Sequence, residues 1–495
     1  MRPQIFRART LAILISGLSL SIAPALQAAD KALLDVLFEN GVITQVQYDN
    51  LMQKESLTSK DILAPAATTA EVSVGKEVIV ENLGPSKLDD QTELAIADAV
   101  ARELEANTSI VASHGSKGFR LATRDGNWET NLQWRGQFRY SNPTGADPRQ
   151  LDDFEEEDSS SFEPRRLRMK IGGHGFQPWL KYYFEVDLQP ARDVNADATS
   201  SGARVIDWRV DIAKLDWLGV RLGQWKIDLN RERVDSSGRQ QFVERSIVNR
   251  VFTIDRQVGI QLKGRLFEGT GADMRYWAGV FNGEGRGVRN DGNDHLYMAR
   301  LQWNFMGRDL AFRQTDVEYT ERPTGSLAFA TFTNEGACTR WSSSGCGNLD
   351  GFLRPGQADP EQYQIDQYVQ EFAFKYRGLS IQQEYHRKDI DDQVLGITSE
   401  LTGFYAQSGY FFHNLIPTFP AELELAARYA YVEEPNEVDR LFDNEREEFS
   451  LGANWFFAGH NNKLTLDYSY LNLDDGLIGR NESQSRVRLQ WDVSF

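Results

Sequence analysis

The chain lacks the long apolar runs that a membrane-crossing helix requires. After residue 30, no stretch of the sequence approaches the roughly 20 consecutive apolar residues of a transmembrane helix. Backbone groups inside a bilayer must be hydrogen-bonded within the protein, so a chain without such helices can cross a membrane only as a closed β-barrel. The mature chain is therefore expected to be either a soluble protein or a barrel.

Basic charge and histidine are also scarce. The 72 acidic residues outnumber the 54 basic ones, and the formal net charge of −18 argues against nucleic acid as a partner. The six histidines are scattered, and the sequence contains no G-x-S-x-G, H-E-x-x-H, Walker A or Cys-x-x-Cys motif. An enzyme built on a membrane barrel would need a nucleophile and a histidine on its wall or rim, and no such cluster stands out. The sequence therefore indicates no catalytic site, no metal and no cofactor.

Only two cysteines are present, Cys338 and Cys346. Their closeness in an exported chain predicts one local disulfide, because oxidation outside the cytoplasm favours the pairing of neighbouring thiols. Two independent thiols are the alternative.

The first residues have the features of a secretory signal peptide. Arg2, Arg7 and Arg9 precede an apolar run at 11–22, and small residues follow up to Ala28. The apolar run is too short to anchor the chain as a membrane helix, for which about 20 residues are needed. We expect residues 1–28 to be cleaved and the mature chain to be exported.

A two-residue alternation dominates the sequence from residue 128 onward. In the first segment Trp134 and Phe138 alternate with Arg135 and Gln137, and the chain ends with the same pattern at Phe495. Alternation over about ten residues, with aromatic side chains toward the ends, is typical of a membrane β-strand. Sixteen such segments are predicted, at 128–140, 165–174, 179–189, 206–215, 217–225, 257–266, 272–282, 294–305, 310–320, 365–377, 379–389, 398–411, 420–432, 447–457, 463–473 and 485–495.

The connections between these segments largely alternate between short and long, as a barrel with both ends in the periplasm requires. The long ones are expected outside, at 141–164, 190–205, 226–256, 283–293, 321–364, 433–446 and 474–484. The acidic run at 152–158 is either a solvated loop or a place where divalent cations bridge to lipid headgroups. The sequence thus predicts an all-β fold, a 16-stranded antiparallel transmembrane β-barrel at 119–495.

Residues 29–118 differ in composition and predict a small helical N-terminal periplasmic extension. Apolar residues recur every four positions at 92–105, which indicates either a helix that packs between protomers and helps a trimer to form, or a flexible linker with transient helices.

The loop at 226–256 is the strongest candidate for a functional site. It carries seven cations against five acids in a chain that is acidic overall. A basic loop folded into the lumen could hold partly dehydrated anions, whereas a loop whose charges pair among themselves would contribute little selectivity. Lumen-facing positions on the first two strands add Arg135, Arg139, Arg166, Arg168 and Lys170, while acids elsewhere in the lumen make the field mixed.

Several longer motifs resemble the phosphate-selective porin O and P family of outer-membrane channels. They are Pro-Arg-Arg-Leu-Arg at 164–168, Val-Arg-Leu-Gly-Gln-Trp-Lys at 220–226, Phe-Val-Glu-Arg-Ser at 242–246, Ala-Gly-Val-Phe-Asn-Gly at 278–283 and the terminal Phe495. The resemblance implies a homotrimer in the outer membrane of a Gram-negative cell, in contact with lipid and lipopolysaccharide. It also implies passive diffusion of small anionic solutes such as phosphate or polyphosphate, and that the barrel-insertion machinery reads Phe495.

The resemblance also assigns residues. Arg135 matches the first-strand arginine of the family, and Arg165 and Arg166 match its paired arginines. Members that bind phosphate tightly carry Ser-Ser-Lys in the constriction loop, where this chain has Ser236, Ser237 and Gly238 followed by Arg239. The expected pore-lining or anion-binding residues are Arg135, Arg165, Arg166, Arg168, Lys226, Arg231, Arg233, Arg239 and Arg245. A general diffusion porin of low selectivity, and a barrel that anchors an envelope-tethering extension, are the alternatives.

Overall fold

The computed structural model describes residues 110–143, 160–188, 203–290, 292, 294–343, 345–435, 440, 443–477 and 479–495. The chain divides into two units, Met1–Ile96 and Ala97–Phe495, and the first contains no described residue. The expected signal peptide, the extension helices and the acidic run of the first long loop lie outside the described residues. No helix in the described ranges is long and apolar enough to cross a membrane.

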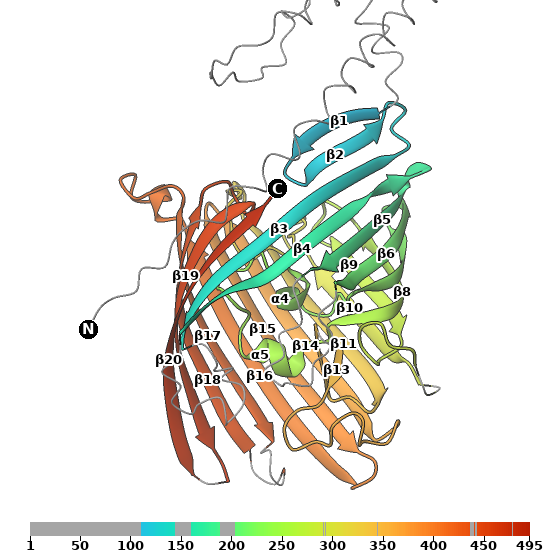
Figure 1. The fold of residues 1–495 in the computed structure, drawn as a ribbon, viewed down its shortest axis with the longest axis vertical. Helices are drawn as coiled ribbons and strands as arrows, with labels where there is room; N and C mark the ends of the chain where they lie inside the picture. The colour runs from blue at the N-terminus through green and yellow to red at the C-terminus, as the bar shows by residue number, and fades with distance from the viewer. Residues whose placement is uncertain are drawn as a thin grey trace, which may run out of the picture. The chain divides into compact units, whose positions relative to one another are not determined.

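Sixteen antiparallel strands of the described chain form a closed barrel (Figure 1), which confirms the predicted fold class. The barrel closes where β20 pairs with β3, from Val487 opposite Asn142 to Ser494 opposite Arg135. The strands are β3 (Glu129–Asn142), β4 (Ser161–Gly175), β5 (Gln177–Asp187), β6 (Arg204–Leu215), β7 (Leu218–Lys226), β8 (Arg256–Leu266), β9 (Met274–Phe281), β10 (Leu296–Trp303), β11 (Thr324–Gly336), β14 (Tyr363–Tyr376), β15 (Leu379–Asp392), β16 (Ile397–Tyr410), β17 (Leu423–Pro435), β18 (Asp443–Phe456), β19 (Asn462–Asp475) and β20 (Arg480–Ser494).

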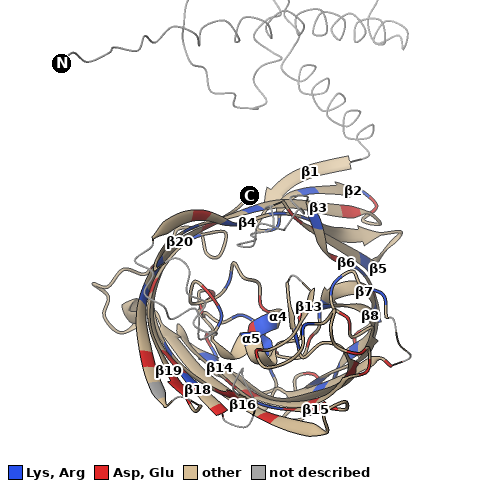
Figure 2. Ribbon diagram, turned by 60° about the horizontal axis from the view of Figure 1, so that its bottom comes forward, with Lys and Arg blue, Asp and Glu red and all other residues tan. Residues whose placement is uncertain are grey.

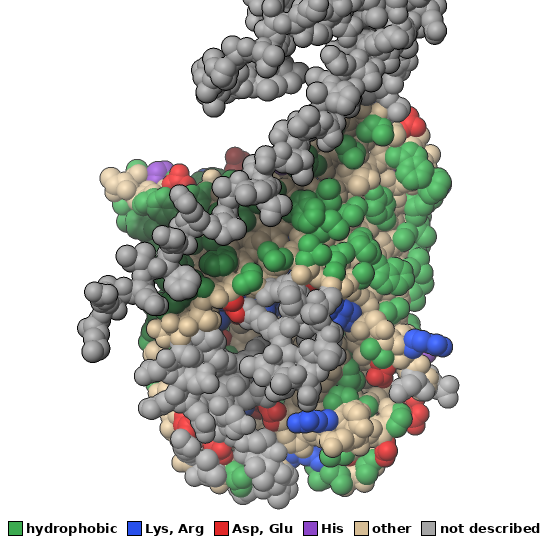
Figure 3. Space-filling view, in the orientation of Figure 1, with side chains coloured by type: hydrophobic (Ala, Val, Ile, Leu, Met, Phe, Trp, Pro, Cys, Tyr) green, Lys and Arg blue, Asp and Glu red, His purple; other side chains and the backbone are tan. Residues whose placement is uncertain are grey.

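The two faces of the wall follow the alternation of the sequence. In β3, Trp134 and Phe138 are about half exposed on the outer face, whereas Arg135, Gln137 and Arg139 are buried on the lumen side. Figure 3 shows hydrophobic side chains gathered over the upper part of the face that β3, β4 and β5 form. An apolar exterior with a polar interior is the arrangement that a lipid environment stabilises.

The predicted strand at 310–320 is wrong, and the ninth strand of the barrel is β11, at Thr324–Gly336. The backbone of 310–320 has other partners, because the carbonyls of Leu310 and Ala311 accept hydrogen bonds from Arg231, at 3.2 and 2.7 Å. Asp316 is buried and accepts the N–H of Gly378 at 2.7 Å. The middle of the 304–323 connection therefore packs inside the barrel without forming a strand, and residues 314–316 are buried in succession there rather than on one alternating face.

A hairpin precedes the barrel and extends its wall. β1 (Ile110–Gly115) pairs with β2 (Gly118–Thr123), and β2 pairs with the first residues of β3. β20 and β2 thus share the same edge of β3, because β20 covers 135–142 and β2 covers 129–132. Gly118 has a φ of +84°, and a Cβ there would lie 2.2 Å from the carbonyl oxygen of Leu132, so only glycine fits this position. The hairpin spans the boundary after residue 118 that the sequence led us to expect.

The connections define two ends of the barrel. The end that holds the β4–β5 turn, the β14–β15 turn and Phe495 is called the short-turn end below, and the opposite end is called the long-loop end. Four connections depart from the expected alternation, and one of them is the long 304–323 connection at the short-turn end. At the long-loop end, residues 393–396 join β15 to β16, and residues 476–479 join β19 to β20. The β16–β17 connection at the short-turn end is longer and contains the 3-10 helix η2 (Phe412–Asn414).

Candidate functional site in the barrel lumen

The 227–255 loop between β7 and β8 folds into the barrel. It contains the short helices α4 (Arg231–Val234) and α5 (Val248–Phe252), which Figure 2 shows inside the ring of strands. Its apolar side chains, among them Leu229 and Phe252, pack in one buried cluster with lumen-facing apolar residues of the wall such as Leu401, Val432 and Leu473. The burial of these apolar surfaces holds the loop inside the barrel.

Carboxylates of the far wall bind the backbone of this loop. Five of them on β14 to β19 accept hydrogen bonds from loop N–H groups or from a loop amide side chain. The pairs are Glu371 with Arg231 N (2.9 Å), Glu384 with Glu232 N (2.7 Å), Glu424 with Gln241 Nε2 (2.8 Å), Glu448 with Ile247 N (3.0 Å) and Asp467 with Val243 N (2.9 Å). Four of these five, Glu371, Glu384, Glu424 and Asp467, are among the acids that the sequence suggested would make the lumen field mixed, so part of that acidic set is engaged in docking the loop.

Four of the predicted site cations support the loop itself. Lys226 Nζ donates to the carbonyls of Arg233 and Asp235, and Arg245 donates to the carbonyls of Glu232 and Asp235. Arg233 forms an ion pair with Asp255. Arg231 points toward the 304–323 connection, where its guanidinium lies 5.1 Å from the ring centre of Phe312. Because Arg231, Arg233 and Arg245 are buried, Lys226 is partly buried, and all four have partners within the protein, these groups contribute to the shape of the loop.

A β-bulge brings the paired arginines of β4 to the lumen side. The pairing of β3 with β4 shifts register between Gln137 and Phe138, which lie opposite Arg166 and Pro164, so Arg165 is the extra residue. Two consecutive side chains can face the same side only where such a bulge interrupts the alternation. Arg168, two residues after Arg166, is buried and forms ion pairs with Glu185 at 3.0 Å and Asp187 at 3.4 Å.

Glu244 of the loop lies among three arginines of the wall. Its carboxylate is 2.8 Å from Arg139 Nη2, 3.0 Å from Arg165 Nε and 3.5 Å from Arg166 Nη2. Burial alone would raise the pKa of Glu244, but Arg166, Arg139 and Arg165 outweigh it and hold that pKa well below its usual range. The acid at this position counters three cations that the sequence presented as pore-lining or lumen-facing.

The Ser236–Arg239 segment faces the first strand. Arg135 donates to Ser236 Oγ at 3.2 Å and to Ser237 Oγ at 3.0 Å. Arg239 is exposed and, within the described part of the chain, its guanidinium makes no hydrogen bond or ion pair. Of the cations predicted in the loop, Arg239 is the one that this structure leaves available to a solute.

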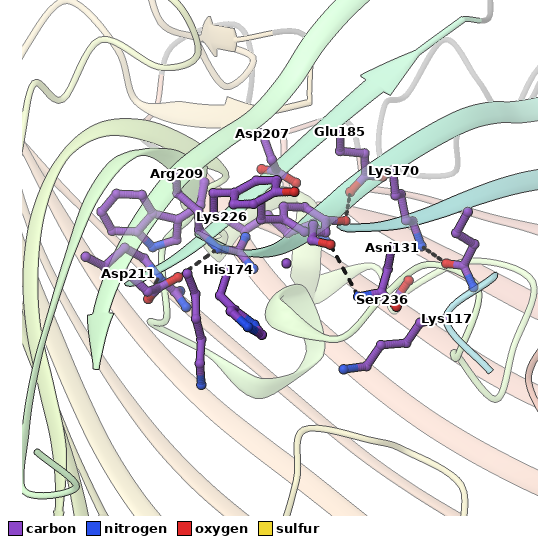
Figure 4. Close-up of a pocket in the computed structure, with 18 of the residues that line it drawn as sticks. Lys117, Asn131, Lys170, His174, Glu185, Asp207, Arg209, Asp211, Lys226 and Ser236 are labelled. Atoms are coloured by element: carbon purple, nitrogen blue, oxygen red, sulfur yellow. Dashed lines mark hydrogen bonds and ion pairs between the residues drawn. The ribbon is translucent and has the colours of Figure 1, made fainter. Parts of the chain in front are cut away.

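A cavity of about 750 Å³ lies between the wall strands β3 to β8 and the loop (Figure 4). Ten lysines and arginines line it against five acids, and each of those acids has an arginine or lysine partner. Among the described residues, Lys117, Lys181 and Arg239 have no hydrogen-bonded or ionic partner for their side chains. Sequence reasoning missed Lys117 and Lys181. Lys181 could have been found, because it lies four residues before Glu185 on β5 and therefore on the same, lumen-facing side of the strand.

A second loop, at 337–362, closes over the apolar cluster at the long-loop end. It contains the hairpin of β12 (Arg340–Ser342) and β13 (Gly345–Gly347), and a disulfide joins Cys338 to Cys346 with 5.6 Å between their Cα atoms. Trp341 is buried in the cluster, and its Nε1 donates to the carbonyl of Gly283 at 2.6 Å. This half of the lumen is therefore packed with side chains, while the basic cavity lies beside β3 to β8.

A closed sixteen-stranded barrel whose lumen holds an inward-folded loop is the architecture of an outer-membrane channel. The chain belongs to the phosphate-selective porin O and P family, whose model matches residues 138–495, so the resemblance noted in the sequence is confirmed. The protein is accordingly an outer-membrane channel for small solutes rather than an enzyme.

Comparisons with single proteins give weaker similarities. An uncharacterized protein of Aquifex aeolicus (strain VF5) is 25% identical over 355 residues, which cover 64% of this chain and 76% of the relative. Among solved structures, the outer membrane channel DcaP of Acinetobacter baumannii is 11% identical, with a TM-score of 0.48 over 74% of this chain and 97% of that chain. The anion-selective porin from Comamonas acidovorans is 12% identical, with a TM-score of 0.46 over 74% and 99%.

Proposed function

We propose that this channel passes small anionic solutes by passive diffusion, with phosphate and polyphosphate among them. The observation that carries the proposal is the separation of charge in the lumen. Wall carboxylates on β14 to β19 are used to dock the loop, whereas Lys117, Lys181 and Arg239 face the cavity without partners among the described residues. A cavity with uncompensated cations attracts anions and lowers the barrier to their entry.

Gly238 stands where tight phosphate binders carry a lysine, so selectivity among anions rests here on arginine. Arg239 can donate to an oxyanion through its planar fork, but it lacks the compact charge of an ammonium group. We therefore propose a preference for anions as a class. A general diffusion channel remains the second candidate, because five acids also line the cavity.

The reversal potential across a planar bilayer with a potassium chloride gradient tests this proposal. Anion preference shifts the reversal potential toward the chloride equilibrium potential, and we expect a modest shift of this sign with ohmic conductance. A reversal potential near zero would favour the general diffusion channel, and one near the potassium equilibrium potential would overturn the anion proposal.

The organisation of the chain belongs to the same proposal. We assign residues 1–28 to a cleaved signal peptide, residues 29–118 to a periplasmic extension that takes part in a homotrimer, and residues 119–495 to the barrel. The trimer and the recognition of Phe495 by the insertion machinery follow from the family. Deleting residues 29–90, which leaves the β1–β2 hairpin intact, and measuring trimer content on native gels tests the role of the extension.

A further inference from the structure

Glu244 differs from the five wall carboxylates that accept hydrogen bonds from the 227–255 loop. Those carboxylates belong to the barrel wall and accept N–H groups of the loop, whereas Glu244 belongs to the loop and forms ion pairs with three arginines of the wall. Its side chain is 26% exposed, so it remains in contact with solvent in the lumen. A negatively charged group here occupies a place that a dissolved anion could reach.

The wall holds two of these three arginines without help from Glu244. Gln490 Oε1 accepts from Arg139 Nε at 3.0 Å and from Arg139 Nη2 at 2.8 Å. Gln137 Oε1 accepts from Arg166 Nη1 at 2.9 Å. Arg165 completes the group because the bulge turns it to the same side. The three donors would therefore stay close together if the Glu244 carboxylate moved away.

Among the described residues, the cations around Glu244 outnumber the acids. A second carboxylate, that of Glu163, lies farther off, at 3.8 Å from Arg139 and 4.0 Å from Arg165. Counted over the described residues alone, three cations thus face two acids, and Glu244 is the acid that lies within hydrogen-bond distance of all three. An oxyanion with several acceptor oxygens can use the same donors as a carboxylate.

We propose that Glu244 is an internal competitor: its carboxylate occupies an oxyanion site formed by Arg139, Arg165 and Arg166, and a tetrahedral oxyanion such as sulfate or phosphate displaces it during permeation. This inference rests on the proposed anion function. A channel site must bind its solute strongly enough to admit it and weakly enough to release it. Glu244 meets the second requirement, because it rebinds the arginines as the solute leaves.

The test is block of chloride current by sulfate in single channels. Glu244→Gln keeps the size of the side chain and removes its charge, and we expect half-block at a sulfate concentration about tenfold lower than in the wild type. Glu163→Gln is the matched control, because it removes a carboxylate from the same surroundings at longer distances. It should change half-block less than about threefold.

The outcomes separate this inference from the proposed function. If the wild type prefers anions but Glu244→Gln blocks at the same or a higher sulfate concentration, the competitor role is overturned and the anion channel stands. If the wild type prefers cations, the proposed function itself fails. Should Glu244→Gln not yield a folded barrel, a wild-type crystal at high sulfate decides. We expect sulfate among the three guanidinium groups with the Glu244 side chain rotated away, and an undisplaced Glu244 contradicts the proposal.

Discussion

Arg135 fills the space that a side chain at position 238 would need. A Cβ added to Gly238 would lie 2.7 Å from Nε and 2.8 Å from Cζ of Arg135. Arg135 is 4% exposed and is held there by Ser236 and Ser237, so its guanidinium cannot move without losing both hydrogen bonds. In this channel the wall arginine, rather than a loop side chain, occupies the position next to Ser237.

Gly238→Ala is therefore expected to lower the free energy of unfolding by about 1–3 kcal/mol, because Arg135 would lose hydrogen bonds while remaining buried. Denaturant titration followed by tryptophan fluorescence measures the change. In the Arg135→Gln background the shorter side chain leaves room, and Gly238→Ala should cost much less. Equal costs in the two backgrounds would show that Arg135 and Gly238 do not interact.

Glu448 accepts a backbone hydrogen bond from the 227–255 loop, whereas its neighbour Glu447 makes no hydrogen bond to that loop within the described residues. Glu448 is buried, accepts Ile247 N and pairs with Arg428, whereas Glu447 bonds Tyr429 Oη at 2.7 Å on the exposed side of β18. We expect Glu448→Ala to destabilise the barrel by about 3–5 kcal/mol, because Arg428 stays buried without its partner. The released loop should also increase single-channel conductance and current noise.

Glu447→Ala is the matched control, since it removes the same kind of side chain from the preceding residue of the same strand. It should leave conductance unchanged and stability within about 0.5 kcal/mol. If both variants conduct like the wild type, the wall carboxylates do not hold the loop in the lumen.

The effect of Glu244 should not depend on pH near neutrality. Its pKa is held well below the usual range, so the carboxylate stays charged until the pH falls through that lowered value. Between about pH 7.5 and about pH 5, the ratio of sulfate half-block between wild type and Glu244→Gln should stay constant. Sulfate keeps its charge over this range, which makes it a better probe than phosphate. A wild type that blocks like Glu244→Gln at the lower pH would mean that Glu244 takes up a proton there.

The barrel could be predicted from the sequence because lipid and water impose a simple alternation. Fifteen of the sixteen predicted segments overlap the strands of the barrel, and Phe495 ends the last of them with its N–H bonded to Trp134. The exception at 310–320 has a similar alternation in the sequence, but in the structure Gln314, Thr315 and Asp316 are buried in succession. Alternation in a sequence does not by itself say whether the backbone of that segment pairs with another strand.

The candidate site was less predictable, because a count of charges does not say which of them are paired. Three loop cations look pore-lining in the sequence but have partners within the protein. Arg231 and Arg245 donate to backbone carbonyls that are 80 and 13 residues away in the sequence, and Arg233 pairs with Asp255. The bulge at Arg165 has no signature in the alternation either. The family motif did identify the pair Arg165 and Arg166. Their contact with Glu244 could not be predicted, because it depends on how the loop folds into the barrel.

The most direct test replaces Arg239 by a cysteine that can then be given a negative or a positive charge. Arg239 is the cation of the loop that lacks a hydrogen-bonded or ionic partner among the described residues. Arg239→Cys supplies an accessible thiol, and Cys338 and Cys346 are joined in a disulfide, so the wild type serves as the unreactive control. Reaction with a sulfonate-bearing thiol reagent should move the reversal potential in a potassium chloride gradient toward cation preference, and an ammonium-bearing reagent should restore anion preference. A reversal potential that neither reagent changes would contradict the claim that anions pass through this basic cavity.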